Sequence, residues 1–246
     1  MELRICKDRV ALGKSAAAYV AQKLREIIAE KGEARIALST GASQFDTLAH
    51  LIKEDVAWDK VEMFHLDEYV ALPETHPASF RKYLKEKFTT QVSLKAVHFV
   101  DGTEENRLAL CDEISRKPID IGLIGIGENA HIAFNDPPAD FETEEPYIVV
   151  NLNDTCKKQQ VGEGWFATVD DVPKQAVSMS VKQIMKCTEI VSCVPYAVKA
   201  EAVQKTLFEP VSNMTPATLL KTHPRFTLYI DGDSVANVTK AIDWIE

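Results

Sequence analysis

The sequence predicts a single α/β domain built around a mostly parallel sheet, with two smaller domains as the alternative. Short apolar runs alternate with amphipathic stretches along the chain, which is the order typical of a sheet covered by helices. At 246 residues, 46% of them hydrophobic, the chain is long enough to bury a full core without a metal ion or a disulfide. No internal repeat or low-complexity tract interrupts this pattern.

Each element is predicted from its own residues. Apolar residues at helical spacing from Leu12 to Ile28 predict a first helix, which Lys31-Gly32 ends. Later helices are expected over 45–52, 79–88 and 104–116, the last capped by Thr103. Strands are expected at 35–38, 61–65, 119–124, 148–152, 176–179, 190–194 and 226–230.

Residues 137–170 depart from the alternation. This stretch contains Pro137-Pro138, an acidic run and Gly162-Glu163-Gly164, with one short strand expected inside it. Long irregular segments in compact domains often act as lids or binding loops. The prediction is a mobile lid over the functional site.

Composition excludes several functional classes. The net charge of −9 argues against nucleic acid or an anionic membrane as the main partner. Five cysteines without C-x-x-C spacing favour reduced thiols in a cytoplasmic protein. The first ten residues lack the apolar region of a signal peptide, and no apolar run approaches 18 residues. The expected location is therefore cytoplasmic, away from membranes.

The first segment that could carry chemistry is Ser39-Thr40-Gly41-Ala42-Ser43, between a predicted strand and a helix. Small residues around a glycine let backbone N–H groups approach an anion, and the following helix N-terminus adds a favourable dipole. An ordinary capped turn is the alternative. The segment lacks the G-x-x-x-x-G-K-[ST] pattern of a P-loop.

The second segment is His65-Leu66-Asp67-Glu68-Tyr69, at the end of the predicted strand 61–65. Adjacent carboxylates cannot point the same way, so one is expected to face the pocket while the other holds a neighbouring loop. A carboxylate withdrawn from water becomes a better base as its pKa rises. A solvated acidic turn is the alternative. His76 follows nine residues after Asp67 and is expected near the same rim.

The third segment runs from Gly125 to Pro137, after the predicted strand 119–124. His131 lies among small and apolar residues, where an imidazole can exchange protons near neutral pH. Asp136 is placed to orient it, as in a base–orienter pair. A purely structural histidine is the alternative reading.

Other chemistries are not expected. Gly125-x-Gly127 lacks the third glycine of a dinucleotide fingerprint, so no cofactor is predicted. The histidines show no H-x-x-x-H spacing and lie apart from the cysteines, so no metal site is predicted. A G-x-S-x-G nucleophile elbow is absent.

Together these segments resemble the glucosamine-6-phosphate deaminase (isomerase) family, which includes the 6-phosphogluconolactonases. The resemblance covers almost the whole chain, and its most specific part is His131-Ile-Ala-Phe-Asn-Asp-Pro137, which is similar to the deaminase branch. The matching stretches, in the family's order, are Leu38–Gly41, Leu66–Val70 with His76–Phe80, Gly125–Pro137 and Val198–Ala200.

The resemblance implies a modified Rossmann-like three-layer α/β/α sandwich. It also implies a reaction in which Asp67 moves a proton between C2 and C1 of an open-chain amino sugar. His131, oriented by Asp136, would assist ring opening. Hydrolysis of the resulting imine would then release ammonia and fructose 6-phosphate.

The resemblance further implies a set of ligand-binding residues. Ser39, Thr40, Gly41 and Lys199 would hold the phosphate of the small phosphorylated sugar. Further candidates for substrate binding are Ala42, Ser43, Glu68 and Gly127.

Three departures from the family pattern bear on activity. The usual Asp-Gly-His is here Asn129-Ala130-His131, so an amide replaces a carboxylate and a methyl group enters the turn. Asn129 is kept as a catalytic candidate beside His131, although the neutral amide puts a role in ring opening in question. Gly164-Trp165-Phe166 stands where a lid arginine is expected. A galactosamine-6-phosphate isomerase, a 6-phosphogluconolactonase and a weakened sugar-phosphate sensor therefore remain alternatives, and the preferred epimer and any assembly into homo-oligomers stay open.

Overall fold

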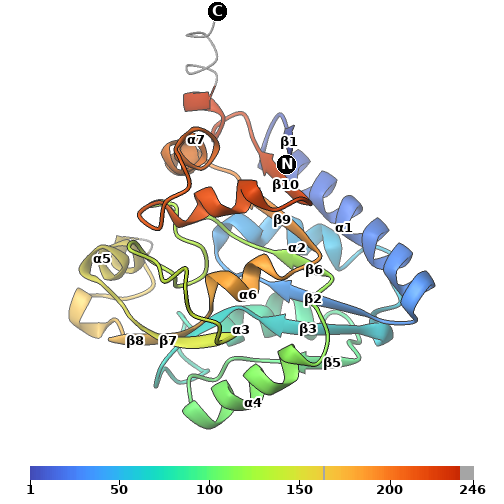
Figure 1. The fold of residues 1–246 in the computed structure, drawn as a ribbon, viewed down its shortest axis with the longest axis horizontal. Helices are drawn as coiled ribbons and strands as arrows, with labels where there is room; N and C mark the ends of the chain where they lie inside the picture. The colour runs from blue at the N-terminus through green and yellow to red at the C-terminus, as the bar shows by residue number, and fades with distance from the viewer. Residues whose placement is uncertain (163, 239–246) are drawn as a thin grey trace, which may run out of the picture.

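Seven parallel strands form the central sheet of the computed structural model, which describes residues 1–162 and 164–238 (Figure 1). The strands lie in the order β1-β10-β9-β6-β2-β3-β5, and every neighbouring pair is parallel. Their bounds are β1 Glu2–Ile5, β2 Ala34–Leu38, β3 Val61–His65, β5 Ala96–His98, β6 Ile121–Leu123, β9 Glu189–Val194 and β10 Phe226–Ile230.

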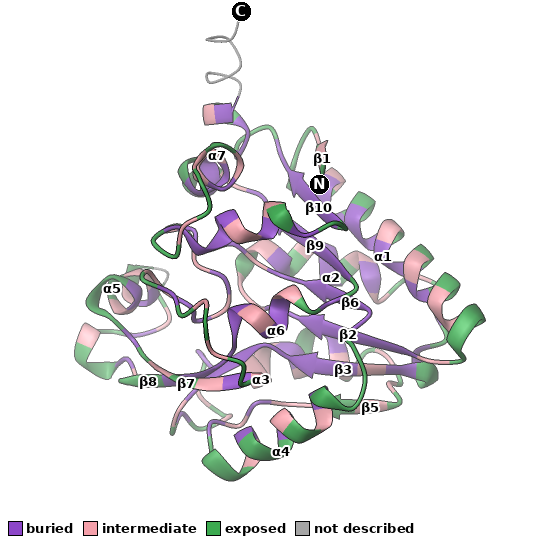
Figure 2. Ribbon diagram, in the orientation of Figure 1, coloured by how far each residue is buried: buried purple, intermediate pink, exposed green. Residues whose placement is uncertain are grey.

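Helices cover both faces of this sheet, and its strands are buried (Figure 2). The strands carry apolar side chains on both faces, so each face needs a covering layer. In β2, Ile36 and Leu38 pack into one core, whereas Ala37 packs into the other. The helices on the first side are α1 Arg9–Lys31, α2 Phe45–Leu51 and α3 Phe80–Leu84. Those on the second side are α4 Glu104–Ser115, α6 Val181–Met185 and α7 Ala200–Phe208. The predicted α/β/α layering is confirmed.

Local signals begin and end the first helix, and its end lies at the predicted Lys31-Gly32. Asp8 accepts a hydrogen bond from the backbone N–H of Ala11 at 2.8 Å and caps the start of α1. Gly32 ends α1 with a φ of 81°, a left-handed conformation that glycine adopts without strain. The helix expected over 79–88 starts at α3 but continues as a π-helical turn, Lys85–Thr89.

A small second sheet differs from the prediction. The strands β4 Asp67–Tyr69, β8 Gln175–Met179 and β7 Tyr147–Asn151 pair antiparallel in the order β4-β8-β7. The sequence indicated the last two as members of one parallel alternation and did not indicate β4, β1 or β5. The residues of β4 are acidic and aromatic, so no apolar alternation marks it, and its pairing partners lie more than 100 residues away.

The stretch predicted to be irregular, 137–170, also contains α5, Asp154–Gly162, besides β7. This helix is strongly polar and only Cys156 and Gln160 are buried in it, so hydrophobic periodicity could not reveal it. A separate cluster of apolar residues, including Tyr69, Phe134 and Phe166, joins this region to the small sheet. None of the helices in the described ranges is long and apolar enough to cross a membrane.

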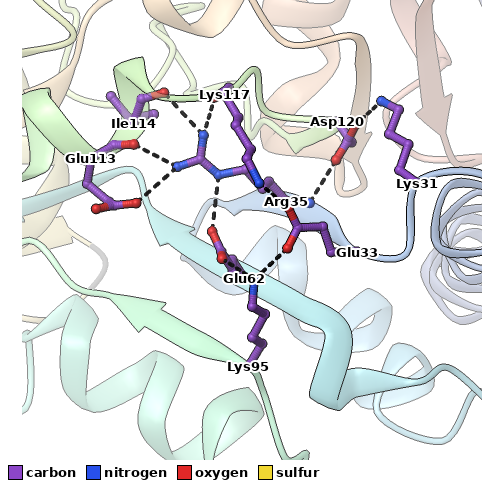
Figure 3. A network of polar contacts seen from close by, with 9 residues as sticks. All are labelled: Lys31, Glu33, Arg35, Glu62, Lys95, Glu113, Ile114, Lys117 and Asp120. Carbon is purple, nitrogen blue, oxygen red and sulfur yellow. Dashed lines mark hydrogen bonds and ion pairs between the residues drawn. The ribbon is translucent and has the colours of Figure 1, made fainter.

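A buried arginine holds the amino end of β2 (Figure 3). The side chain of Arg35 is only 3% exposed, and its Nε lies 3.3 Å from Oε2 of Glu62. Its Nη2 donates to the carbonyl oxygen of Glu113 at 2.8 Å, and its guanidinium lies 4.4 Å from the centroid of the Phe64 ring. The arginine therefore joins β2 to β3 and α4 at the end of the sheet opposite the site described below.

Arg35→Ala is expected to lower the free energy of unfolding by about 3 kcal/mol, because it leaves Glu62 and Glu113 without their shared buried cation. Urea unfolding at pH 7 measures this change. Lys205→Ala is the control, since the Lys205–Glu201 pair is largely solvated and contributes little to stability. Equal effects of the two substitutions would contradict a structural role for Arg35.

Candidate active site

A cavity of about 460 Å³ lies beyond the carboxyl ends of β2, β3, β6 and β9. Parallel strands place their loops at one edge of the sheet, so segments distant in the sequence converge there. The cavity brings together nine of the twelve predicted site residues, and it leaves Glu68, Asn129 and Asp136 outside its lining. The nine are Ser39, Thr40, Gly41, Ala42, Ser43, Asp67, Gly127, His131 and Lys199.

The loop after β2 has the geometry of an anion site. The backbone N–H of Ser39 donates to the carbonyl oxygen of Leu123 at 3.0 Å and ties the loop to β6. Gly41 adopts a φ of 97°, and the N–H groups of Thr40 and Gly41 donate to no acceptor in the described residues. Lys199, only 8% exposed, lines the same cavity from the segment after β9. Free N–H groups and a nearby ammonium are what a phosphate group requires.

Asp67 is a buried carboxyl group in the cavity wall. It begins β4, pairs with Ser178 of β8 and is only 6% exposed. Burial, with a smaller contribution from the charge of Glu68, raises the pKa of Asp67 to about 8. A carboxylate with such a pKa is a much stronger base than a solvated one.

Glu68 points away from the cavity, so the structure does not place this predicted substrate-binding residue at the ligand. Its Oε2 accepts hydrogen bonds from Ser79 Oγ at 2.8 Å and from the backbone N–H of Arg81 at 2.9 Å. Its carboxylate also lies 3.5 Å from Nε of Arg81. Glu68 therefore anchors the start of α3 against β4, as expected for the second of two adjacent carboxylates.

His131 is held by its two polar neighbours. Its Nδ1 lies 2.5 Å from Oδ1 of Asn129, and because an amide oxygen only accepts, Nδ1 carries the proton. Asn129 in turn donates from Nδ2 to Oδ1 of Asp136 at 3.0 Å, and this oxygen lies 3.3 Å from Nδ1 of His131. The arrangement leaves Nε2 as the ring nitrogen available for proton exchange.

Asp136 supports this histidine as an ionised group. Burial acts to raise the pKa of Asp136, but its contact with His131 and the hydrogen bond from Asn129 outweigh this effect, and the pKa is lowered. Asn129 thus stands between the carboxylate and the imidazole and contacts both. Sequence reasoning predicted an orienting role for Asp136, whereas the structure shows that Asn129 makes the shorter contact.

Gly127 makes room for the imidazole. A Cβ atom at this position would lie between 2.1 and 2.4 Å from three atoms of the His131 ring. Ala130, three residues on, adopts a φ of 63° and packs its methyl group in the core. The methyl group therefore finds a buried site, although the left-handed backbone there would suit glycine better.

Several further lining residues carried no signal that single-sequence reasoning could use. Gln159, Gln160 and Trp165 reach the cavity from α5 and the segment after it. Two phenols line it as well: Tyr83 from α3 and Tyr196 from the end of β9. His76 was expected near the rim of the site, but it is not among the residues that line the cavity. Its ring stacks on Phe166, with ring centroids 5.2 Å apart.

One group outside the cavity brings potential metal ligands together. Among the described residues, ligand atoms of Glu62, His98 and Glu113 lie within 4.8 Å of one another. Both carboxylates already face cations, since Arg35 and Lys95 contact Glu62 and Arg116 contacts Glu113. These ion pairs account for the acidic residues without a metal ion.

Fold and cavity define a class: an α/β protein in which a loop with free backbone N–H groups, a buried carboxyl group and an imidazole share one cavity at the carboxyl edge of a parallel sheet. The sequence model of the glucosamine-6-phosphate isomerases/6-phosphogluconolactonase family matches residues 7–228. The chain belongs to this family.

Individual relatives agree with this assignment. A glucosamine-6-phosphate deaminase of Staphylococcus epidermidis is 39% identical over 230 residues, which cover 88% of this chain and 92% of the relative. One from Streptococcus pneumoniae is 29% identical over 222 residues, 87% and 93% of the two chains.

Solved structures show the same fold. A monomeric glucosamine-6-phosphate deaminase superposes with a TM-score of 0.84 at 28% identity, covering 96% of this chain and 99% of the other. A 6-phosphogluconolactonase of Trypanosoma brucei gives a TM-score of 0.79 at 15% identity, over 96% and 98% of the chains. At that lower identity the likeness concerns the fold alone.

Proposed function

We propose that this protein converts glucosamine 6-phosphate and water to fructose 6-phosphate and ammonia. The observation that carries the proposal is the buried Asp67, whose carboxyl group shares one cavity with His131 and an anion-binding loop. The deaminase relatives support the same reaction. Its chemistry needs a base at carbon, a proton exchanger at the ring oxygen and a phosphate anchor.

His131 catalyses ring opening in this proposal. Its Nε2 takes the proton of the C1 hydroxyl group and returns it to the ring oxygen as the C1–O5 bond breaks, giving the open-chain aldehyde. Asn129 holds the other ring nitrogen as a donor, so Nε2 starts without a proton. The ionised Asp136 stabilises the imidazolium that forms during the transfer.

Asp67 is the base for the isomerisation step. Its carboxylate removes the proton from C2 to give an enolate, and O1 takes a proton from the ammonium group at C2 to become a hydroxyl group. The same carboxyl group then returns its proton to C1. The nitrogen at C2 is then an imine, which a water molecule attacks to release ammonia and leave the ketone. The loop 39–43 and Lys199 hold the phosphate, which keeps C1 and C2 in place during both transfers.

The segment from α5 to Phe166 is proposed as the lid over this site, because Gln159, Gln160 and Trp165 border the cavity from one side. Amide hydrogen exchange over 154–162 is expected to slow when a sugar phosphate binds. Identical exchange with and without ligand would contradict a lid.

The pH dependence of kcat/KM follows from Asp67. The base works only when ionised, and its pKa of about 8 in the ligand-free protein makes the acid form dominant at neutral pH. We expect kcat/KM to fall about tenfold for each pH unit below 8 and to level off above it. Initial rates between pH 5.5 and 9.5 at subsaturating substrate measure this profile. A plateau reaching down to pH 5 would contradict the raised pKa of Asp67.

The decisive experiment is coupled detection of ammonia and fructose 6-phosphate from glucosamine 6-phosphate, with galactosamine 6-phosphate in parallel. Ammonia from the gluco substrate is the expected result, and ammonia from the galacto epimer alone would move the specificity but keep the mechanism. If neither substrate releases ammonia, the deaminase proposal is wrong. Hydrolysis of 6-phosphogluconolactone above its spontaneous rate would then identify a lactonase, whereas binding without turnover would identify a sensor.

A further inference from the structure

Tyr83 lies in the wall of the cavity with a hydroxyl group that has no partner. It belongs to α3, whose start Glu68 anchors, and its backbone N–H donates to the carbonyl oxygen of Ser79 at 3.1 Å. Its hydroxyl oxygen is closed to water and finds no hydrogen-bond partner among residues 1–162 and 164–238. A buried hydroxyl group without a partner costs free energy, so such a group in a ligand cavity calls for an acceptor.

The contacts of Tyr83 place its ring beside the anion loop. The Tyr83 ring stacks on Phe45, with centroids 5.4 Å apart and 23° between the planes, and Phe45 follows the loop 39–43 directly. Tyr196 is close enough to contribute to the raised pKa of Tyr83, after the larger effect of burial, and its own hydroxyl group lies 3.4 Å from the carbonyl oxygen of Ala42. Tyr83 is thus fixed beside the loop as a protonated donor.

The rest of the cavity offers few cationic side chains to bind a phosphate dianion. Among the described lining residues Lys199 is the one lysine, and no arginine is present, although a phosphate dianion brings three strong acceptor oxygens. Ser39 Oγ is a second shielded hydroxyl group without a partner in the same wall. The cavity wall therefore offers two neutral hydroxyl donors besides its one ammonium group.

We propose that the Tyr83 hydroxyl group donates a hydrogen bond to the phosphate of the substrate and, with Lys199 and the loop 39–43, fixes the phosphate end of the ligand. The inference rests on the proposed function only for the identity of the sugar, because the phosphate subsite stands on its own geometry. Tyr83 is a binding residue in this reading and takes no part in proton transfer.

Tyr83→Phe removes one oxygen atom and keeps the stacked ring, which makes it the matched test. Inorganic phosphate is the probe, with its dissociation constant measured by calorimetry and by thermal shift in the absence of sugar. We expect the affinity for phosphate to fall at least tenfold, because the lost hydrogen bond is one to a charged group. The ligand-free variant should melt at the same temperature or higher, since a shielded hydroxyl group without a partner has been removed.

Tyr19→Phe is the control, because Tyr19 lies on α1 outside the cavity and its hydroxyl group contacts Glu189. It is expected to leave the affinity for phosphate unchanged. Two results would overturn the inference: an unchanged affinity for phosphate in Tyr83→Phe, or a lower melting temperature of that variant without ligand, which would reveal a structural bond.

The kinetic readout separates this inference from the proposed function. With an active wild type, Tyr83→Phe should raise the KM for glucosamine 6-phosphate at least tenfold and change kcat less than threefold. If the wild type releases no ammonia while Tyr83→Phe still weakens phosphate binding, the deaminase proposal fails and the phosphate contact stands. If the wild type turns over rapidly but Tyr83→Phe has an unchanged KM and an unchanged affinity for phosphate, the proposed Tyr83–phosphate contact is wrong and the deaminase proposal stands.

Discussion

Asp67→Asn is expected to reduce kcat about a thousandfold while leaving the fold intact. The amide cannot accept a proton from C2, and a general base contributes about 10²- to 10⁴-fold to such a step. Asn is nearly isosteric with Asp, and no described group donates a hydrogen bond to the Asp67 side chain, so the packing around it persists. Steady-state ammonia release with purified variant measures the loss.

The same variant should be more stable than the wild type at high pH, and this serves as its control. The pKa of Asp67 is about 8 in the folded protein against an ordinary value of 3.8, so between these values the folded state retains a proton that the unfolded state has lost. The wild type therefore loses stability as the pH rises from about 4 to 8, whereas Asp67→Asn does not. The free energy of unfolding of Asp67→Asn minus that of the wild type, measured by urea unfolding, should be larger at pH 9 than at pH 5 by about a few kcal/mol. A constant difference would mean that Asp67 is not buried as an acid.

Gly127→Ala is expected to reduce kcat at least a hundredfold, because the added methyl group occupies the place of the His131 ring. The Cβ atom would lie 2.1 Å from Cε1 and 2.4 Å from Nε2 of the imidazole, far inside van der Waals contact. Asn129 holds the ring through Nδ1, so the imidazole has to leave this hydrogen bond to relieve the clash. Ring opening should become rate-limiting in this variant.

The control for this substitution is Gly162→Ala. A Cβ atom at Gly162 meets nothing within 4 Å, so the same change in composition should alter kcat by less than twofold. Nitrogen-15 spectra of the imidazole report the displacement of His131 directly. A normal histidine signal together with normal turnover in Gly127→Ala would show that the ring does not need this space.

The candidate site was predictable in its parts because each part is local in the sequence. The loop 39–43, the pair Asp67-Glu68 and the turn around His131 each follow a strand whose apolar residues mark it. The rule that ligands bind beyond the carboxyl ends of parallel strands then predicts that they meet, and the cavity lining agrees. Glu68 shows the limit of this reasoning, since which of two adjacent carboxylates faces the ligand depends on Ser79 and Arg81.

Other features lay beyond sequence reasoning for physical reasons. The helix α5 is polar on most of its surface and gives no periodic signal, yet it supplies one wall of the cavity. In the sequence, Tyr83 looks like one more apolar residue of a short helix. Only the structure shows that its buried hydroxyl group has no hydrogen-bond partner among the described residues.

The sequence by itself determined the parallel α/β architecture, the end of the first helix at Gly32 and the three segments that carry polar chemistry, because hydrophobic periodicity and capping act over a few residues. Only the tertiary structure decided the properties of the groups within them. Asp67 becomes a strong base through burial under β8, whose Ser178 lies 111 positions away, and Asn129 comes to bridge His131 and Asp136 through the fold of its turn. Burial and hydrogen-bond geometry set a pKa, and both depend on long-range packing that no local pattern contains.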